Sequence, residues 1–276
     1  MSINSKVFDK NYYYHVCLGS EEFKKSGGNQ LHPKVKNMID RLSLKKTMTV
    51  LEIGCGRGDT ALYVAKKVTS VTAIDYSSDA ITIAKGIQKK QKKDIQQRTQ
   101  FYKMAATNLH FKDNSFDFIL FIDTIDHLNK KEQKKALQEI SRVLKKDGQV
   151  FIRTCSNNIL LSYTYKYYTY PLNTFLTWID QKIKNIVYKS LPKDPRTKEE
   201  KRQHINELNY FSLYKLVSPF FKKITITAEP GYVKEGKSLR TRLYNFLIAF
   251  FPFSQYIPLN ILFGHSFLCK LQSLKK

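Results

Sequence analysis

Apolar and polar residues alternate along residues 45–155 in segments typical of strands followed by helices. Five apolar runs predict strands: MTVLEIG (48–54), SVTAIDYS (70–77), TQFYKMA (99–105), FDFILFID (116–123) and QVFIRTC (149–155). Helices are predicted from apolar spacing at 31–43, at 61–68, after Ser77 or Ser78, and at 130–145, with a turn at KKDG (145–148). This alternation predicts an α/β fold with a doubly wound, mostly parallel sheet.

The pattern changes after Cys155. Residues 156–210 are rich in tyrosine and basic residues and predict an insertion of aromatic, basic helices. The sequence leaves three roles for this insertion: a lid, a dimer contact or a membrane anchor. FFKKITITAEP (220–230) and HSFLCKLQ (265–272) predict two further strands, separated by a proline-broken apolar stretch.

Composition adds constraints on location and partners. The four cysteines show no CxxC or Cys/His pairing, so we predict no metal site and a reducing, cytoplasmic setting. Neither a secretory leader nor a membrane-spanning run is predicted. The formal net charge of +24 suits nucleic acid or an anionic membrane, but solvated lysines on helix faces explain it equally well.

The segment VLEIGCGRGDT (50–60) is the strongest candidate site. Glycines between a strand and a helix allow the backbone to approach a ligand closely. Asp59 stands where a dinucleotide-binding GxGxxG motif needs its third glycine, and it would oppose a pyrophosphate. Asp75 ends the second strand, where an acid can accept hydrogen bonds from ribose hydroxyls. We therefore expect a nucleoside ligand without a phosphate at the loop.

The same segments resemble the S-adenosylmethionine-dependent methyltransferases of the Rossmann-like class. VLEIGCGRGDT is similar to their first motif and VTAIDYSSDAI to their second-strand motif, and the likeness extends through NLHFKDNSFDFILFIDTIDHL and KKDGQVFI. It covers about residues 45–155 well and the strands near 220–228 and 265–272 more weakly. It implies a seven-stranded sheet whose last two strands form an antiparallel edge pair, with helical insertions before and within that pair.

The resemblance divides the chain into four parts. These are an N-terminal lid or helix (1–44), an S-adenosylmethionine-binding core (45–155), the helical insertion (156–210), and the C-terminal edge strands (211–276) with an apolar insertion at 231–263. A basic flank beside that last insertion favours either docking on an anionic bilayer, at the inner membrane face, or a buried cap over the site. Tyr12, Tyr13 and Tyr14 either close over the cofactor or anchor the first helix.

The resemblance also implies the cofactor-binding residues. Glu52, Gly54, Gly56 and Gly58 would surround the methionine and ribose, Asp75 would bind the ribose, and Tyr76 would lie against the adenine. The other positions are Cys55, Ala105, Ala106, Ile122 and Asp123. Many relatives carry an acid where this chain has Ala105, so one polar contact to adenine is lost, worth about 1 kcal/mol.

Catalysis then requires an acceptor nucleophile placed in line with the transferred methyl group. His127 and Asp123, in FIDTIDHL beyond the fourth strand, are the candidate catalytic residues if a base is needed. The same loop lacks the Asn/Asp-Pro-Pro-aromatic motif with which many base-modifying methyltransferases bind a nucleobase. We expect a small-molecule or lipid-like acceptor; an RNA methyltransferase and a non-catalytic cofactor-binding scaffold are the alternatives.

Overall fold

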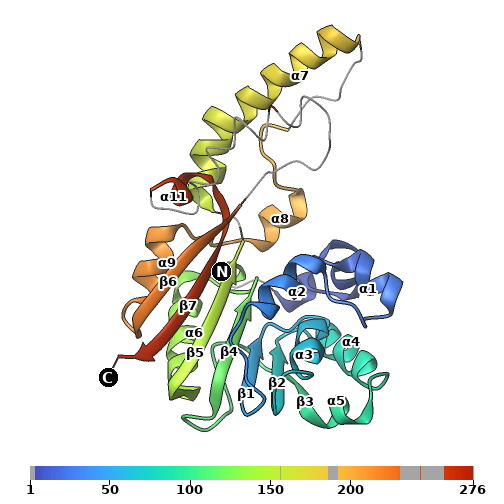
Figure 1. Cartoon of the computed structure of the whole chain (residues 1–276), viewed down its shortest axis with the longest axis vertical. Helices are drawn as coiled ribbons and strands as arrows, with labels where there is room; N and C mark the ends of the chain where they lie inside the picture. Colours follow the sequence, from blue (N-terminus) through green and yellow to red (C-terminus); the bar gives the residue numbers. More distant parts are fainter. Residues whose placement is uncertain (1–3, 156, 186–191, 231–242, 244–257, 276) are drawn as a thin grey trace.

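One sheet organises the chain in the computed structural model, which describes residues 4–155, 157–185, 192–230, 243 and 258–275 (Figure 1). Within these ranges seven strands form it, in the order β3-β2-β1-β4-β5-β7-β6. The strands are β1 (Thr49–Ile53), β2 (Ser70–Asp75), β3 (Thr99–Lys103), β4 (Phe116–Ile122), β5 (Leu144–Thr154), β6 (Phe221–Pro230) and β7 (Gly264–Leu274). Strands β1 to β5 pair in parallel, and β7 runs antiparallel to both β5 and β6.

Helices fill most connections between these strands. They are α1 (Ser20–Ser26), α2 (Pro33–Asp40), α3 (Asp59–Val64), α4 (Ser78–Gln88), α5 (Lys93–Arg98), α6 (Lys130–Val143), α7 (Tyr170–Lys184), α8 (Lys198–Gln203), α9 (Tyr210–Val217) and α11 (Leu259–Phe263). Short helical turns add η1 (Ser5–Val7), η2 (Tyr12–Val16), η3 (Ile125–His127) and η4 (Leu160–Thr169). The doubly wound fold and its antiparallel edge pair are therefore confirmed.

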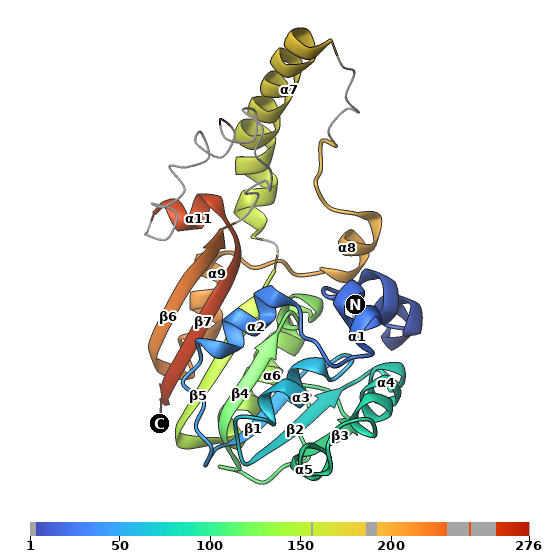
Figure 2. The same ribbon diagram turned by 45° about the vertical axis from the view of Figure 1, so that its right-hand side comes forward.

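Two hydrophobic clusters cover the two faces of the sheet. Val50 and Leu120 face the side packed by the N-terminal segment and α2 to α5, whereas Leu51 and Phe121 face α6 and α9. The two views in Figures 1 and 2 show the sheet between these layers. Because strand order reverses between β1 and β4, the carboxyl ends of β1, β2 and β4 meet at a crevice where ligands bind in such sheets.

Local sequence explains where several helices begin. Ser77 caps α4, since its Oγ accepts a hydrogen bond from the N–H of Ala80 at 3.3 Å. Asn129 and Glu132 form a reciprocal capping box at the start of α6. These caps place the segments that follow β2 and β4, and both segments border the crevice.

Among the differences from the sequence-based prediction, two have a clear local reason. The predicted turn at residues 145–148 lies inside β5, which begins at Leu144 because this residue pairs with Phe116 of β4 before a register shift. Helix α5 was not predicted because Ile95 is its one buried residue, so no apolar periodicity marks it.

The insertion between β5 and β6 is helical as predicted, and it contains η4, α7 and α8 before α9. Helix α7 projects away from the sheet (Figure 2). The apolar stretch 231–263 lies largely outside the described residues, which resume at α11 before β7. Among the helices that the structure describes, each is too short or too polar to cross a bilayer.

Truncating Phe121 tests the central packing. This side chain is fully buried in β4, so Phe121→Ala should lower the free energy of unfolding by about 3–5 kcal/mol, through lost burial and a residual cavity. Phe211→Ala is the control, because this ring on α9 is 60% exposed and its loss should change stability by less than about 0.5 kcal/mol. Urea unfolding measures both, and equal losses would contradict the assignment of Phe121 to the core.

Candidate functional site

A cavity of about 620 Å³ opens at the carboxyl ends of β1, β2 and β4. Most residues singled out in the sequence line it: Glu52, Gly54, Cys55, Gly56, Asp75, Tyr76, Ala105, Ala106, Ile122, Asp123 and His127. The fold therefore collects these residues around one space, as expected for loops at a topological switch point.

The loop after β1 depends on its glycines in two ways. Gly54 has a φ of 75°, and a Cβ there would lie 2.1 Å from the Oγ1 of Thr124. Gly58, with a φ of 80°, lies outside the cavity lining, and its Cβ would meet the ring of Phe101 at 2.7 Å. Gly58 thus allows α3 to start close to β3, and the sequence pattern did not separate this packing role from ligand contact.

Asp75 fixes the shape of the loop. Its Oδ2 accepts a hydrogen bond from the N–H of Gly56 at 2.9 Å, and its Oδ1 accepts one from the N–H of Ser77 at 2.9 Å. Burial raises the pKa of this carboxyl group, and the two backbone N–H groups oppose that rise. Each oxygen keeps acceptor capacity for a further donor, which suits a pair of ribose hydroxyls.

Glu52 brings a second buried carboxyl group to the cavity. It is 4% exposed, and its Oε2 has no hydrogen-bond partner among the described residues. Burial, followed by the charges of Asp59 and Asp75, raises its pKa well above the usual range. An unpaired buried carboxyl oxygen is costly, so a ligand bringing an N–H donor or a positive charge fits this wall of the cavity.

Arg57, which sequence analysis did not single out, attaches the N-terminal segment to the loop. Its guanidinium donates to the backbone oxygens of Tyr13 at 2.8 Å and Leu18 at 2.7 Å, and it forms an ion pair with Asp59 at 3.1 Å. The guanidinium also lies 4.5 Å from the centre of the Phe23 ring. With Arg57 only 3% exposed, these contacts hold residues 12–23 beside the cavity.

The three adjacent tyrosines occupy different positions. Tyr12 and Tyr13 line the cavity, and burial raises the pKa of both phenols. Tyr14 is 37% exposed and packs edge-on against Phe23. The lid role of residues 1–44 stays a prediction, supported by the position of Tyr12 and Tyr13.

Oppositely charged side chains also meet beside the cavity. Arg153 of β5 pairs with Asp123 and, at 2.8 Å, with Glu229 of β6, which Lys34 also approaches at 3.3 Å. The thiol of Cys155 donates to the Oδ1 of Asp123 at 3.0 Å. Because these partners occupy its carboxylate, Asp123 is placed to shape the cavity and is poorly placed to remove a proton. Its φ of 47° is strained for a residue with a side chain.

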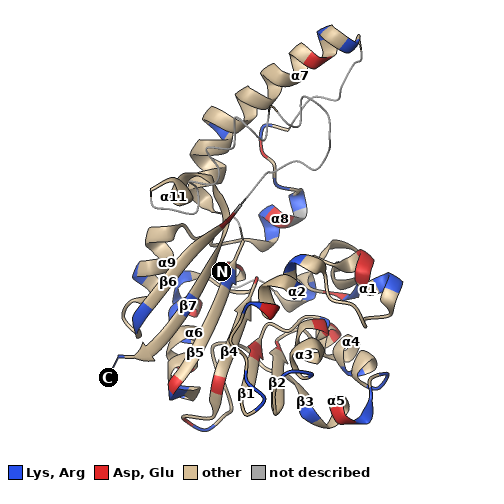
Figure 3. Ribbon diagram, in the orientation of Figure 1, with Lys and Arg blue, Asp and Glu red and all other residues tan. Residues whose placement is uncertain are grey.

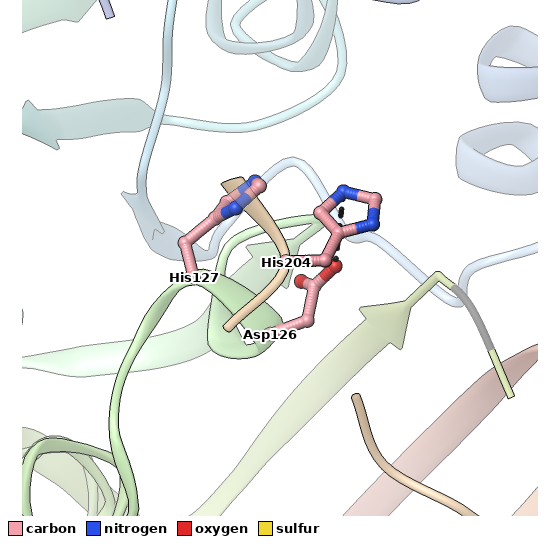
Figure 4. Close-up of side chains that lie close together, drawn as sticks. All are labelled: Asp126, His127 and His204. Atoms are coloured by element: carbon pink, nitrogen blue, oxygen red, sulfur yellow. Dashed lines mark ion pairs between the residues drawn. The ribbon is translucent and has the colours of Figure 1, made fainter. Parts of the chain in front are cut away.

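A second group of side chains meets beyond the end of β4. Asp126 and His127 belong to η3, and His204 follows α8, so the insertion contributes to the site (Figure 4). The Nε2 of His204 lies 3.6 Å from the Oδ2 of Asp126. His127 and His204 line the cavity, and their ring centres are 5.1 Å apart. No sequence signal linked His204 to this loop, because the two segments are distant along the chain.

Comparison with known proteins identifies the central part of the chain. Residues 50–148 match the family described as "Methyltransferase domain". Norajmaline N-methyltransferase of Rauvolfia serpentina is 37% identical over 100 residues, which cover 36% of this chain and 33% of that protein. Ubiquinone biosynthesis O-methyltransferase of Pelagibacter ubique is 34% identical over 120 residues, covering 44% and 47%. The chain thus spans a third to a half of the length of these relatives.

Solved structures show the same fold over a longer range. The PH0226 protein of Pyrococcus horikoshii has a TM-score of 0.53 at 18% identity, with 95% of this chain and 98% of that chain covered. The family match over residues 50–148 confirms the predicted resemblance to methyltransferases, and the solved structure agrees with the Rossmann-like fold.

The half-buried imidazole of His265, which lines the cavity, should make stability depend on pH. Burial, with the charges of Lys34 and Arg153, lowers its pKa from 6.5 to about 4. Between these values the unfolded chain binds a proton that the folded chain does not, so the free energy of unfolding should fall as pH falls from 6.5 towards 4.

Urea unfolding across this pH range measures the effect. His265→Gln should flatten the slope, whatever its effect on stability at neutral pH, and His110→Gln, at an exposed position, should leave the slope unchanged. Parallel slopes for the wild-type protein and His265→Gln would contradict this origin of acid sensitivity.

Proposed function

We propose that this chain, which contains a Rossmann-like S-adenosylmethionine-dependent methyltransferase domain, transfers a methyl group from that cofactor to a small-molecule acceptor. The observation that carries the proposal is that two buried carboxyl groups lie beside the glycine loop that follows β1. The free Oε2 of Glu52 and the loop-bound carboxylate of Asp75 lie on one cavity wall with Gly54 and Gly56.

These residues fit the cofactor by their chemistry. Glu52 suits the ammonium of its methionine part, Asp75 suits the ribose hydroxyls, and Tyr76 offers a ring to the adenine. Ala105 lines the cavity without offering a carboxylate, so adenine recognition falls to backbone groups near Ala106. When bound, the cofactor supplies a methyl group on a positively charged sulfur. The chain's own contribution is to orient the acceptor towards that methyl group.

The rest of the cavity favours an apolar organic acceptor. Its walls also include the apolar side chains of Phe8, Val16, Leu18, Leu31, Val35 and Leu128. Two of the relatives are named for an N-methyltransferase and for an O-methyltransferase of ubiquinone biosynthesis. Both names support a small organic acceptor carrying nitrogen or oxygen. They favour this class over RNA.

Calorimetric titration of S-adenosylmethionine and of its demethylated product tests cofactor binding. Both should bind the wild-type protein, and NAD should not. Asp75→Asn should weaken binding by about 10- to 100-fold, because a charge-assisted hydrogen bond contributes about 1.5–3 kcal/mol. If the wild-type protein bound neither S-adenosylmethionine nor its demethylated product, the proposed methyl transfer would be refuted and only the fold assignment would remain.

A transfer assay with methyl-labelled cofactor and a host lysate then separates the acceptor classes. Label in the small-molecule or organic fraction supports the proposal. Label in RNA would support the RNA methyltransferase, and binding without any transfer would support the scaffold. The Asp75→Asn protein serves as the control for background labelling.

A peripheral membrane position is a second proposal, carried by the exposed aromatic residues of the insertion. Phe175 and Trp178 are each 55% exposed on α7, with ring centres 6.2 Å apart and nearly parallel planes. Lys182 and Lys184 follow in the last turn of the helix. Figure 3 shows other Lys and Arg residues spread over α1, α2 and α8. Aromatic rings beside lysines on a projecting helix suit the interface of an anionic bilayer.

Vesicle sedimentation tests this position. The protein should bind vesicles containing phosphatidylglycerol more strongly than phosphatidylcholine vesicles, and salt should weaken the binding. Replacing Phe175 and Trp178 with serine should weaken it by about tenfold or more, since burial of the two rings together contributes more than about 1.4 kcal/mol. Phe211→Ser, on α9, is the matched control. Equal binding by the double variant and the control would refute the proposal.

A further inference from the structure

Asp126 is the most unusual charged residue of the site. It is fully buried, and neither of its carboxylate oxygens has a hydrogen-bond partner among the described residues. A buried carboxylate without donors is strongly unfavourable unless a cation compensates for its charge. The nearest basic group, the Nε2 of His204, is 3.6 Å from Oδ2, beyond ordinary hydrogen-bond distance.

His127 is oriented as a ligand rather than as a donor into the cavity. Its Nδ1 lies 2.9 Å from the backbone oxygen of Gln203. A carbonyl oxygen only accepts hydrogen bonds, so Nδ1 carries the proton and the lone pair of a neutral ring is on Nε2. A backbone carbonyl that fixes a histidine tautomer in this way is the usual outer partner of a metal-binding histidine.

His204 completes the group from the insertion. The N–H of Asn206 donates to the backbone oxygen of Asp126 at 3.2 Å, which holds the segment after α8 against η3. One ligand atom from each of Asp126, His127 and His204 lies within 4.8 Å of the other two (Figure 4). In tetrahedral coordination, ligand atoms about 2.0–2.2 Å from one ion are about 3.3–3.6 Å apart. A modest rotation of the two histidine side chains would bring all three ligand atoms to this spacing.

We propose that Asp126, His127 and His204 bind a divalent transition-metal ion such as Zn²⁺. Two imidazole nitrogens and one carboxylate oxygen suit zinc or a neighbouring first-row ion, whereas magnesium and calcium prefer oxygen ligands alone. Three protein ligands leave a coordination position open, as in catalytic rather than structural zinc sites. Both histidines line the cavity, so that open position faces the space proposed for the acceptor.

The site also has a chemical consequence, which rests on the proposed function. An ion held by these three side chains would bind an acceptor hydroxyl through its open position and would lower the pKa of that hydroxyl, whose proton would pass to water in the cavity. The acceptor class is then a hydroxyl-bearing organic molecule. His127 acts as a metal ligand in this arrangement, which replaces the role of general base predicted for it from the sequence.

Calorimetric titration of ZnCl₂ into chelator-treated protein tests the site. The wild-type protein should bind one equivalent at this site. Asp126→Asn and His204→Gln should each weaken that binding by more than about a hundredfold, because even outer-shell changes weaken metal sites by about 10- to 100-fold. His110→Gln, which removes an exposed histidine on another loop, should bind as the wild type does. Equal binding by all four proteins, or none by the wild type, would overturn the proposal.

Two further measurements separate the possible failures. Substitution with Co²⁺ should give visible absorption bands of a four- or five-coordinate nitrogen and oxygen site in the wild-type protein, a readout that needs no variant to fold. Binding of the demethylated cofactor is measured on the same samples. Zinc binding without cofactor binding would refute the proposed function and leave the metal site standing, whereas cofactor binding without zinc binding would do the reverse.

Discussion

The hydrogen bond from the Gly56 N–H to Asp75 is the constraint on which the cofactor side of the cavity depends. It joins the loop after β1 to the end of β2, beside the point where the N–H groups of Gly54 and Cys55 both donate to Ile74. The loop shape set in this way places Arg57 where it can hold the backbone of residues 13 and 18. The position of residues 12–23 beside the cavity therefore depends on the same hydrogen bond as the shape of the glycine loop. A substitution at Asp75 changes both.

The two ends of the cavity are built differently. The cofactor end consists of loops that follow neighbouring parallel strands, so its residues are close in sequence to the strands that position them. The part of the cavity proposed for the acceptor draws on distant segments: Arg153 lies in β5, His204 follows α8, and Lys34 belongs to α2. Only folding brings these side chains together. Relatives that share the cofactor part of the fold can therefore differ in acceptor, which agrees with sequence matches over about 100 to 140 residues of this chain.

This difference also decides what could be predicted from the sequence. The parallel strands, the glycine loop and Asp75 were predictable because apolar runs and local spacing encode them. The start of β5 was not, since Leu144 is drawn into the strand by its pairing with Phe116. Gly58 was assigned to the cofactor because spacing alone cannot distinguish a glycine that faces a ligand from one that packs against Phe101.

The helical insertion adds polar groups to the cavity of the domain that this chain shares with methyltransferases. The end of α8 places His204 beside Asp126, and the backbone oxygen of Gln203 sets the tautomer of His127. A buried carboxylate in η3 would weaken the fold unless some group from outside the core compensated for its charge, and the insertion is the element that reaches it. The insertion therefore contributes side chains to the cavity instead of only covering it, and under the proposed function these side chains lie on the acceptor side.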